Sequence, residues 1–203
     1  MIDEDSPPIL TEITGSIAIV RFNRPAQRNP LSLDTLQELR RTTSALFSRD
    51  EIQTVIFTGA ADVFASGADI RELAQLDAQA ALEFSKFGQD LFQTIADARQ
   101  VTIAAINGYC IGGGLDLALA CDVRVASKSA LFSHPGARLG IITGWGGTQR
   151  LPGIIGRARA LEFFATVRRY SSSAALEIGL ISHVGDPVME CALECARAVT
   201  NPS

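Results

Sequence analysis

Three glycines, Gly112 to Gly114, stand just before the carboxylate Asp116 in the stretch NGYCIGGGLDLALACD. Glycine has no Cβ, so another molecule can approach its backbone closely. The apolar run after Asp116 predicts a short helix, and the first amides of a helix have no intrahelical acceptor and carry partial positive charge. This stretch therefore predicts N–H donors for an anionic oxygen, with a carboxylate beside them that can move a proton.

A second loop repeats the same order of features. The segment VIFTGAADVFASGADI, residues 55–70, also runs from a buried strand through glycines to a helix start. Such loops lie at the carboxyl ends of the strands of an α/β sheet, where ligands bind. Two helix starts facing one another would offer two donors to one oxygen, which is the geometry of an oxyanion hole. The alternative is that the glycines only allow close packing of strands against helices.

Other known glycine-containing motifs do not match this sequence at specific residues. A dinucleotide-binding G-x-G-x-x-G would need glycine at position 117, where Leu117 stands, and no G-K-[ST] follows a glycine loop. The segment FASGA is not the nucleophile elbow G-x-S-x-G, because Phe64 and Ala68 occupy its glycine positions. A dinucleotide site, a P-loop and a serine hydrolase elbow are therefore disfavoured.

The elements that must position these loops alternate along the chain. Short β-rich runs bounded by glycine or turn residues predict strands, and amphipathic runs with Ser32 as one N-cap predict helices. Strands that alternate with helices indicate an α/β domain with crossover connections. The expected strands are 9–13, 17–22, 54–59, 101–106 and 123–126, and the expected helices are 32–50, 68–76, 77–98, 115–121, 146–151, 157–167, 173–179 and 187–199.

Composition limits the classes of function. The 203 residues carry a formal net charge of −4 and 47% hydrophobic residues, without a basic stripe for nucleic acid or an apolar run that could cross a membrane. The acidic start MIDEDSPP is unlike a secretory leader and favours a cytoplasmic location. The cysteines Cys110, Cys121, Cys191 and Cys195 lack CxxC spacing, which predicts reduced core thiols and no metal site.

Four segments resemble the signature blocks of one known family. They are NRPAQRNPLS, FASGADIREL, AAINGYCIGGGLDLALACDVRVAS and RLGIITGWGGTQRLP, and the resemblance extends from residue 9 to residue 199. In order and spacing they are similar to the enoyl-CoA hydratase/isomerase (crotonase) superfamily. The resemblance implies a crotonase-like (ClpP/crotonase) α/β fold of repeated ββα units, in a single domain over residues 1–203. Its core would span about 9–185, followed by a C-terminal helical segment, 186–200, shorter than in the family.

The resemblance also implies a ligand and a site. The substrate would be an acyl-CoA thioester, with coenzyme A as part of the substrate and no prosthetic group. Its thioester oxygen would accept hydrogen bonds from the backbone N–H groups of Ser66 and Gly113, with Asp116 as acid and base. Coenzyme A would be bound by residues Arg24, Arg28, Ala68, Asp69, Ile70 and Arg71, of which Asp69 can instead cap its helix.

Two departures from the family pattern bear on the reaction. Family hydratases use two glutamates, and here their positions hold Asp116 and Gly136. Loss of one of two carboxylates disfavours ordinary hydration, because each acid–base group contributes about 10²–10⁴-fold. Double-bond isomerisation needs one base and is favoured, while decarboxylation or bond cleavage stays open. The loop HPGARLGIITGWGG offers His134 as a further acid or base and Trp145 as a pocket wall.

A different class of function remains. A degenerate member of the family would bind acyl-CoA or a partner subunit without turnover. In either case the resemblance implies a homo-oligomer, a trimer or hexamer, and no nucleic-acid or membrane partner. Apolar residues near the loops could line an acyl pocket; they are Ile111, Leu115, Leu139, Ile141 and Trp145.

Overall fold

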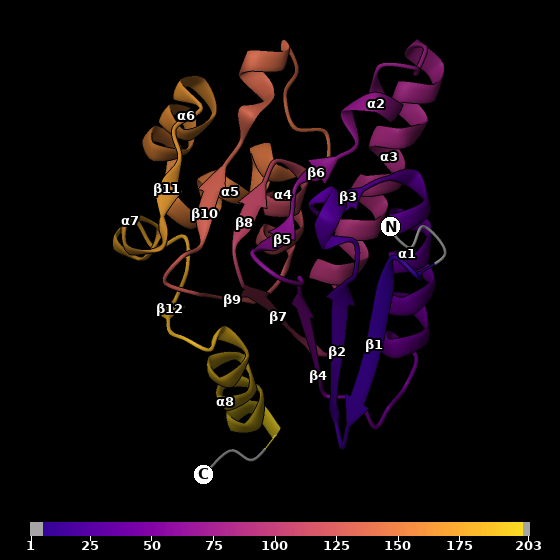
Figure 1. Cartoon of the computed structure of the whole chain (residues 1–203), viewed down its shortest axis with the longest axis vertical. Coiled ribbons are helices and arrows are strands. Elements are labelled where there is room, and N and C mark those ends of the chain that lie inside the picture. Colours follow the sequence, from indigo (N-terminus) through magenta and orange to yellow (C-terminus); the bar gives the residue numbers. More distant parts are fainter. Residues whose placement is uncertain (1–5, 201–203) are drawn as a thin grey trace.

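The fold is built around a twisted six-stranded sheet, seen in a computed structural model that describes residues 6–200 (Figure 1). The strand order is β1-β2-β4-β7-β9-β12; β1 and β2 form an antiparallel hairpin, and every other neighbouring pair is parallel. All five residues of β4 are buried, as expected of a parallel strand covered on both faces. The strands are β1 (Ile9–Thr14), β2 (Ile17–Phe22), β4 (Thr54–Thr58), β7 (Val101–Ile106), β9 (Val123–Ala126) and β12 (His183–Val184).

A second, four-stranded sheet in the order β11-β10-β8-β5 lies above the first in Figure 1. Each of β5, β8 and β10 follows directly after β4, β7 and β9 of the large sheet. A helix follows β8 at once, whereas the short strand β6 precedes the helix after β5 and a 3₁₀ turn precedes the helix after β10. This recurring strand, strand, helix order is the ββα repeat predicted from the sequence. The short strands are β5 (Val63–Ala65), β8 (Tyr109–Ile111), β10 (Leu131–Ser133) and β11 (Tyr170–Ser171), with a separate parallel pair β3 (Pro30–Leu31) and β6 (Gly67–Ala68).

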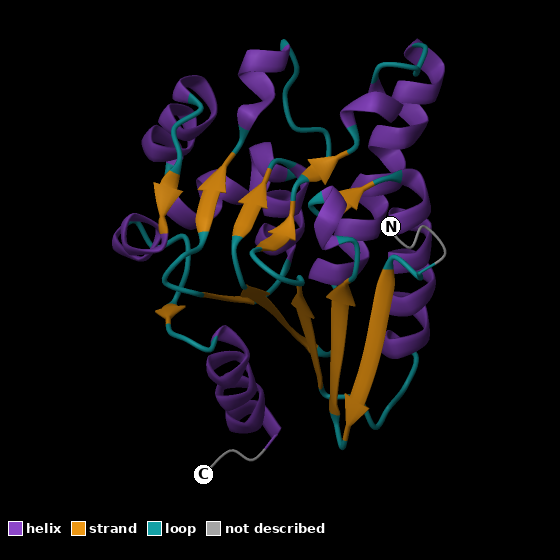
Figure 2. Cartoon of the chain, in the orientation of Figure 1, coloured by secondary structure: helices purple, strands orange, loops and turns teal. Residues whose placement is uncertain are grey.

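Helices surround the two sheets (Figure 2). The main apolar core lies between the sheets and these helices, and a second cluster under α8 joins Ile56 and Ile103 of the large sheet to Ala192 and Ala196. No described helix is long and apolar enough to cross a membrane. The helices are α1 (Leu33–Phe47), α2 (Ile70–Leu73), α3 (Ala78–Ala96), α4 (Gly113–Ala120), α5 (Gly147–Ile155), α6 (Arg157–Thr166), α7 (Ser172–Glu177) and α8 (Val188–Thr200), with 3₁₀ turns η1 (Pro25–Gln27) and η2 (Pro135–Leu139).

Side-chain caps fix where several helices begin. Ser32 accepts a hydrogen bond from the backbone N–H of Thr35, at 3.3 Å, which confirms the predicted N-cap of α1. Asp69 caps α2 in the same way through Arg71 N, at 2.9 Å. These two caps fix the start of a helix on each side of the β3/β6 pair, and so help to position the loop that carries Ser66.

Candidate functional site

The two glycine loops meet, as predicted. A methyl group added at Gly67 would lie 2.7 Å from the backbone nitrogen of Gly113, and one added at Gly113 would lie 3.4 Å from that of Ala68. Gly67 has φ +89° and Gly112 has φ +55°, a backbone region that other residues rarely adopt. The glycines are therefore required both for the turns and for the close approach of the two chain segments.

The two amides that the sequence predicted as donors differ in their surroundings. Gly113 is the first residue of α4, so its N–H has no acceptor within the helix. The N–H of Ser66 instead donates to the carbonyl oxygens of Arg28, at 3.1 Å, and Asn29, at 3.3 Å. This geometry disagrees with the prediction for Ser66, because an amide bonded inside the fold is not available to a ligand. The reason is tertiary: the pairing of β3 with β6 brings the chain before Pro30 against Ser66.

Asp116 lies in the first turn of α4 and is 1% exposed. The hydroxyl of Thr143 donates a hydrogen bond to its Oδ2. A methyl group added at Gly147, the first residue of α5, would lie 2.1 Å from its Oδ1, so only glycine leaves room for the carboxylate there. Asp116 is therefore a buried acid that lines a cavity and has a hydroxyl donor on one oxygen.

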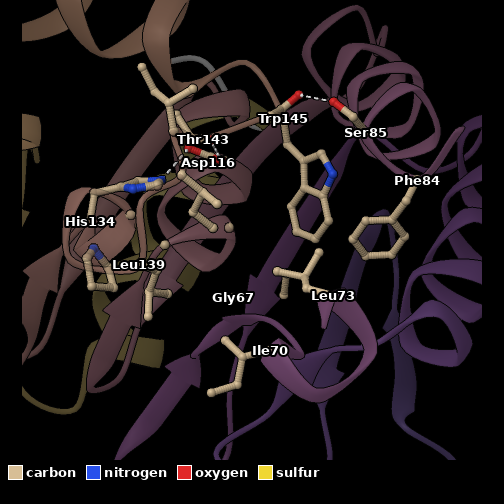
Figure 3. A pocket seen from close by; sticks show the side chains of 18 of the residues that line it. Gly67, Ile70, Leu73, Phe84, Ser85, Asp116, His134, Leu139, Thr143 and Trp145 are labelled. Atoms are coloured by element: carbon tan, nitrogen blue, oxygen red, sulfur yellow. Dashed lines mark hydrogen bonds and ion pairs between the residues drawn. The ribbon is translucent and has the colours of Figure 1, made fainter. Parts of the chain in front are cut away.

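His134 comes close to the other oxygen of that carboxylate. Its Nε2 is 3.5 Å from Oδ1 of Asp116 (Figure 3), and the imidazole is 6% exposed. The imidazole packs edge-on against the ring of Phe164, with 5.3 Å between the ring centroids. At Gly136, a methyl group would lie 2.7 Å from the carbonyl oxygen of Ile141 and 3.5 Å from Nδ1 of His134. The cavity wall therefore carries an imidazole beside the position where family hydratases have their second glutamate.

These groups line a cavity of about 530 Å³ whose other walls are largely apolar. Trp145 forms one wall, 4% exposed, with its ring centroid 5.3 Å from that of Phe84 and 5.6 Å from that of Phe92. A methyl group at Gly88 or at Gly113 would come within 2.3 Å of the indole, so both glycines are needed to seat it. Figure 3 shows Trp145 and Phe84 on one side of the cavity and His134, Thr143 and Asp116 on the other.

Two of the arginines expected to bind coenzyme A are paired with acids of the chain itself. Arg24 meets Asp34 at 2.8 Å, and Arg71 meets Asp69 at 2.7 Å, which holds the pKa of that carboxyl below its usual value. Arg28 has no carboxylate partner within the described residues. Its guanidinium lies 6.0 Å from the centre of the Tyr109 ring. Ala68 and Ile70 line the cavity, and Ile70 is 61% exposed.

Sequence reasoning missed the structural importance of Gly88 and Gly147. Each is a glycine whose neighbour across the fold is a site residue, Trp145 or Asp116 respectively. Gly88 sits inside an amphipathic helix and Gly147 in a glycine pair, so no local pattern distinguishes them from ordinary turn or packing glycines. Among the described residues, no group of three or more His, Cys, Asp or Glu side chains is placed to hold a metal ion.

The letters and the geometry agree with a family model. The model described as Enoyl-CoA hydratase/isomerase matches residues 12–203. The chain belongs to the enoyl-CoA hydratase/isomerase family. This membership confirms the crotonase superfamily resemblance, and the fold class with it.

Relatives within the enoyl-CoA hydratase/isomerase family match most of the chain. Short-chain-enoyl-CoA hydratase of Clostridium acetobutylicum is 35% identical over 196 residues, covering 95% of this chain and 75% of that protein. Crotonyl-CoA hydratase of Syntrophomonas wolfei is 38% identical over 180 residues, covering 88% and 69%. The solved structure of enoyl-CoA hydratase from Bacillus anthracis is 36% identical, with a TM-score of 0.91 and coverage of 95% and 76%. That of DspI from Pseudomonas aeruginosa is 34% identical, with a TM-score of 0.92 and coverage of 96% and 75%. The chain is an acyl-CoA-processing enzyme of this family.

Proposed function

We propose that this enzyme binds an unsaturated acyl-CoA thioester in the 530 Å³ cavity and moves its double bond through an enolate intermediate. The observation that carries the proposal is the amide of Gly113, without an intrahelical acceptor, beside Ala68 in the same cavity as the buried carboxylate of Asp116. Together these groups supply what an enolate needs, which is a donor set for the oxygen and a base for the carbon.

The second donor is the N–H of Ala68 rather than that of Ser66. Pro30 has no N–H, so its parallel pairing with Gly67 must use the N–H of Gly67. Gly67, at φ +89°, turns the chain between Ser66, whose N–H is bonded to Arg28 and Asn29, and Ala68. The nitrogen of Ala68 lies 3.4 Å from the position of a Cβ at Gly113, so this amide borders the predicted oxyanion position.

Backbone donors in such a place stabilise the enolate strongly. Removing one oxyanion donor costs roughly 2.7–4 kcal/mol of transition-state stabilisation in enzymes where this was tested. The walls around Trp145 are largely apolar, and electrostatic interactions are stronger where the local dielectric constant is low. The acidity of the carbon next to the thioester therefore rises when the oxygen sits between Gly113 and Ala68.

Asp116 is the base that removes the proton. Its Oδ2 is held by the Thr143 hydroxyl, and its Oδ1 is free to accept a proton from the substrate. Gly136 supplies no second carboxylate, so the site favours a reaction that begins with removal of a carbon-bound proton over addition of water by two carboxylates. Double-bond isomerisation is that reaction. Coenzyme A belongs to the substrate, and Arg28 is the arginine we assign to its phosphates.

The test is a comparison of two reactions of the purified enzyme. One assay follows conversion of 3-enoyl-CoA thioesters of increasing length to their conjugated 2-enoyl isomers, and the other follows hydration of crotonyl-CoA. We expect isomerisation to be the faster reaction. Faster hydration would contradict the isomerase assignment, and turnover of neither substrate despite coenzyme A binding would favour the acyl-CoA-binding alternative.

A further inference from the structure

Two polar atoms in the cavity wall are buried without a hydrogen-bond partner. They are Oδ1 of Asp116 and Nε2 of His134, and they lie 3.5 Å from one another. A buried polar atom without a partner costs about 1–3 kcal/mol, so native proteins rarely keep one unless a ligand or a function requires it. Two such atoms side by side in a substrate cavity indicate that they serve the reaction.

The surroundings fix both atoms in this position. The Thr143 hydroxyl donates a hydrogen bond to Oδ2 of Asp116, and the other oxygen, Oδ1, faces the imidazole. The edge-on contact with Phe164 at 5.3 Å supports the ring of His134 from the protein side. A methyl group at Gly136 would make only an ordinary van der Waals contact with Nδ1, at 3.5 Å, but it would lie 2.7 Å from the carbonyl oxygen of Ile141. The Thr143 hydroxyl and the Phe164 ring therefore support the carboxylate and the imidazole in their facing positions.

A purely structural histidine would look different. In a packed core its ring nitrogens find acceptors or donors in the protein, because burial removes water from them. Here Nε2 finds none among the described residues, although the ring is buried and lines the cavity. At 3.5 Å, facing lone pairs on Nε2 and Oδ1 would repel each other, so a proton on one of the two atoms relieves the contact.

We propose that His134 is a second catalytic residue, which delivers the proton that completes the double-bond migration. This inference rests on the proposed function and assigns one of its steps. Asp116 takes a proton from the carbon next to the thioester, that C–H bond breaks, and its electron pair spreads into a dienolate held by Gly113 and Ala68. The protonated imidazole then gives its Nε2 proton to the γ-carbon, where the new C–H bond forms.

The proton count closes without solvent. The step converts a carboxylate and an imidazolium into a carboxylic acid and a neutral imidazole, and the substrate has lost one proton and gained another. Transfer of the proton from Asp116 Oδ1 to His134 Nε2, across the 3.5 Å contact, restores the starting enzyme. Only the β-carbon separates the α- and γ-carbons of the enoyl group, a spacing that two adjacent proton carriers can serve.

The experiment compares His134→Gln with His183→Gln, which changes the other histidine of the chain, exposed on β12. Isomerisation is measured for both at saturating substrate, along with coenzyme A affinity and thermal unfolding. We expect His134→Gln to lose about 10²–10⁴-fold in kcat at little change in affinity, the usual worth of an acid–base group, and His183→Gln to match the wild type. A His134→Gln enzyme that keeps more than half of the wild-type rate would overturn the assignment.

A second variant separates catalysis from support of the fold. His134→Ala leaves a cavity the size of an imidazole beside Phe164, and imidazole added to the assay is expected to restore part of the rate. Loss of activity without this rescue, in a variant that folds and binds coenzyme A, would contradict the role of His134. If the wild type and His183→Gln also lack isomerase activity, the proposed function itself fails, which distinguishes the two failures.

Discussion

Replacement of Asp116 by asparagine removes the proposed base and keeps its shape. The side chain is 1% exposed, and the Thr143 hydroxyl can donate to the amide oxygen as it does to the carboxylate. The variant also removes the anion that faces the buried His134 imidazole at 3.5 Å, so we expect the free energy of unfolding to fall by up to about 3 kcal/mol. Activity is therefore compared at a temperature where thermal unfolding shows the variant to be folded, so that a large loss of rate is chemical rather than structural.

The expected loss follows from the role of the carboxylate. A positioned general base contributes about 10²–10⁴-fold, which corresponds to about 2.7–5.4 kcal/mol in the activation barrier. The donors on Gly113 and Ala68 are main-chain groups and stay in place in the variant. We therefore expect the loss to appear in kcat for isomerisation. The affinity for a coenzyme A thioester should stay within about twofold of the wild type, which is a small fraction of the roughly 1.4 kcal/mol that corresponds to a tenfold change.

The assay follows the absorbance of the conjugated 2-enoyl thioester, with binding measured by calorimetry and stability by thermal unfolding. Asp90→Asn is the matched control, because Asp90 is an exposed acid on α3 outside the cavity. An Asp116→Asn enzyme that keeps more than half of the wild-type kcat would refute the assignment of the base. A loss confined to substrate affinity would refute it as well, since it would place Asp116 in binding rather than in proton transfer.

Other consequences concern stability and thiol chemistry. Alanine normally stabilises a helix relative to glycine, and Gly153→Ala on α5, where the methyl meets nothing within 4 Å, should raise the free energy of unfolding by roughly 0.5–1 kcal/mol. Gly88→Ala on α3 should lower the free energy of unfolding by about 1–3 kcal/mol, because its methyl would lie 2.3 Å from the Trp145 indole. Urea unfolding measures the change in both variants, and a change of the same sign in both would contradict the packing described. Burial raises the pKa of Cys121 to about 12 and that of Cys110 well above its usual value, so titration with a thiol reagent at pH 8 should find both unreactive until the protein is unfolded. Rapid labelling of either cysteine in the native state would show that the core around α4 opens.

The long elements could be predicted from the sequence because each carries its own pattern. The strands at 54–58 and 101–106 are short runs of apolar residues and threonine, and α3 shows helical periodicity between clear end signals. The small second sheet could not be predicted in the same way. Its strands β5, β8 and β10 have three residues each, too few for a period to show, and only their pairing across distant parts of the chain defines them.

The residues of the candidate site likewise fall into those that a local sequence pattern indicates and those that only long-range contacts define. Gly113 and Asp116 belong to one loop and helix, so the local sequence pattern was enough to predict them as site residues. The choice between Ser66 and Ala68 depends on which amide is used by the pairing with β3, a contact that joins positions more than thirty residues apart. The contact of His134 with Asp116 likewise depends on how two separate loops pack, which the order of residues along the chain does not reveal.

The most direct test of the oxyanion site is a crystal structure with bound acetoacetyl-CoA. We predict that the thioester oxygen lies within about 2.7–3.1 Å of the backbone nitrogens of both Gly113 and Ala68, with Asp116 facing the acidic carbon. A thioester oxygen that contacts neither amide, or an Ala68 N–H bonded to a carbonyl of the chain itself, would contradict the account.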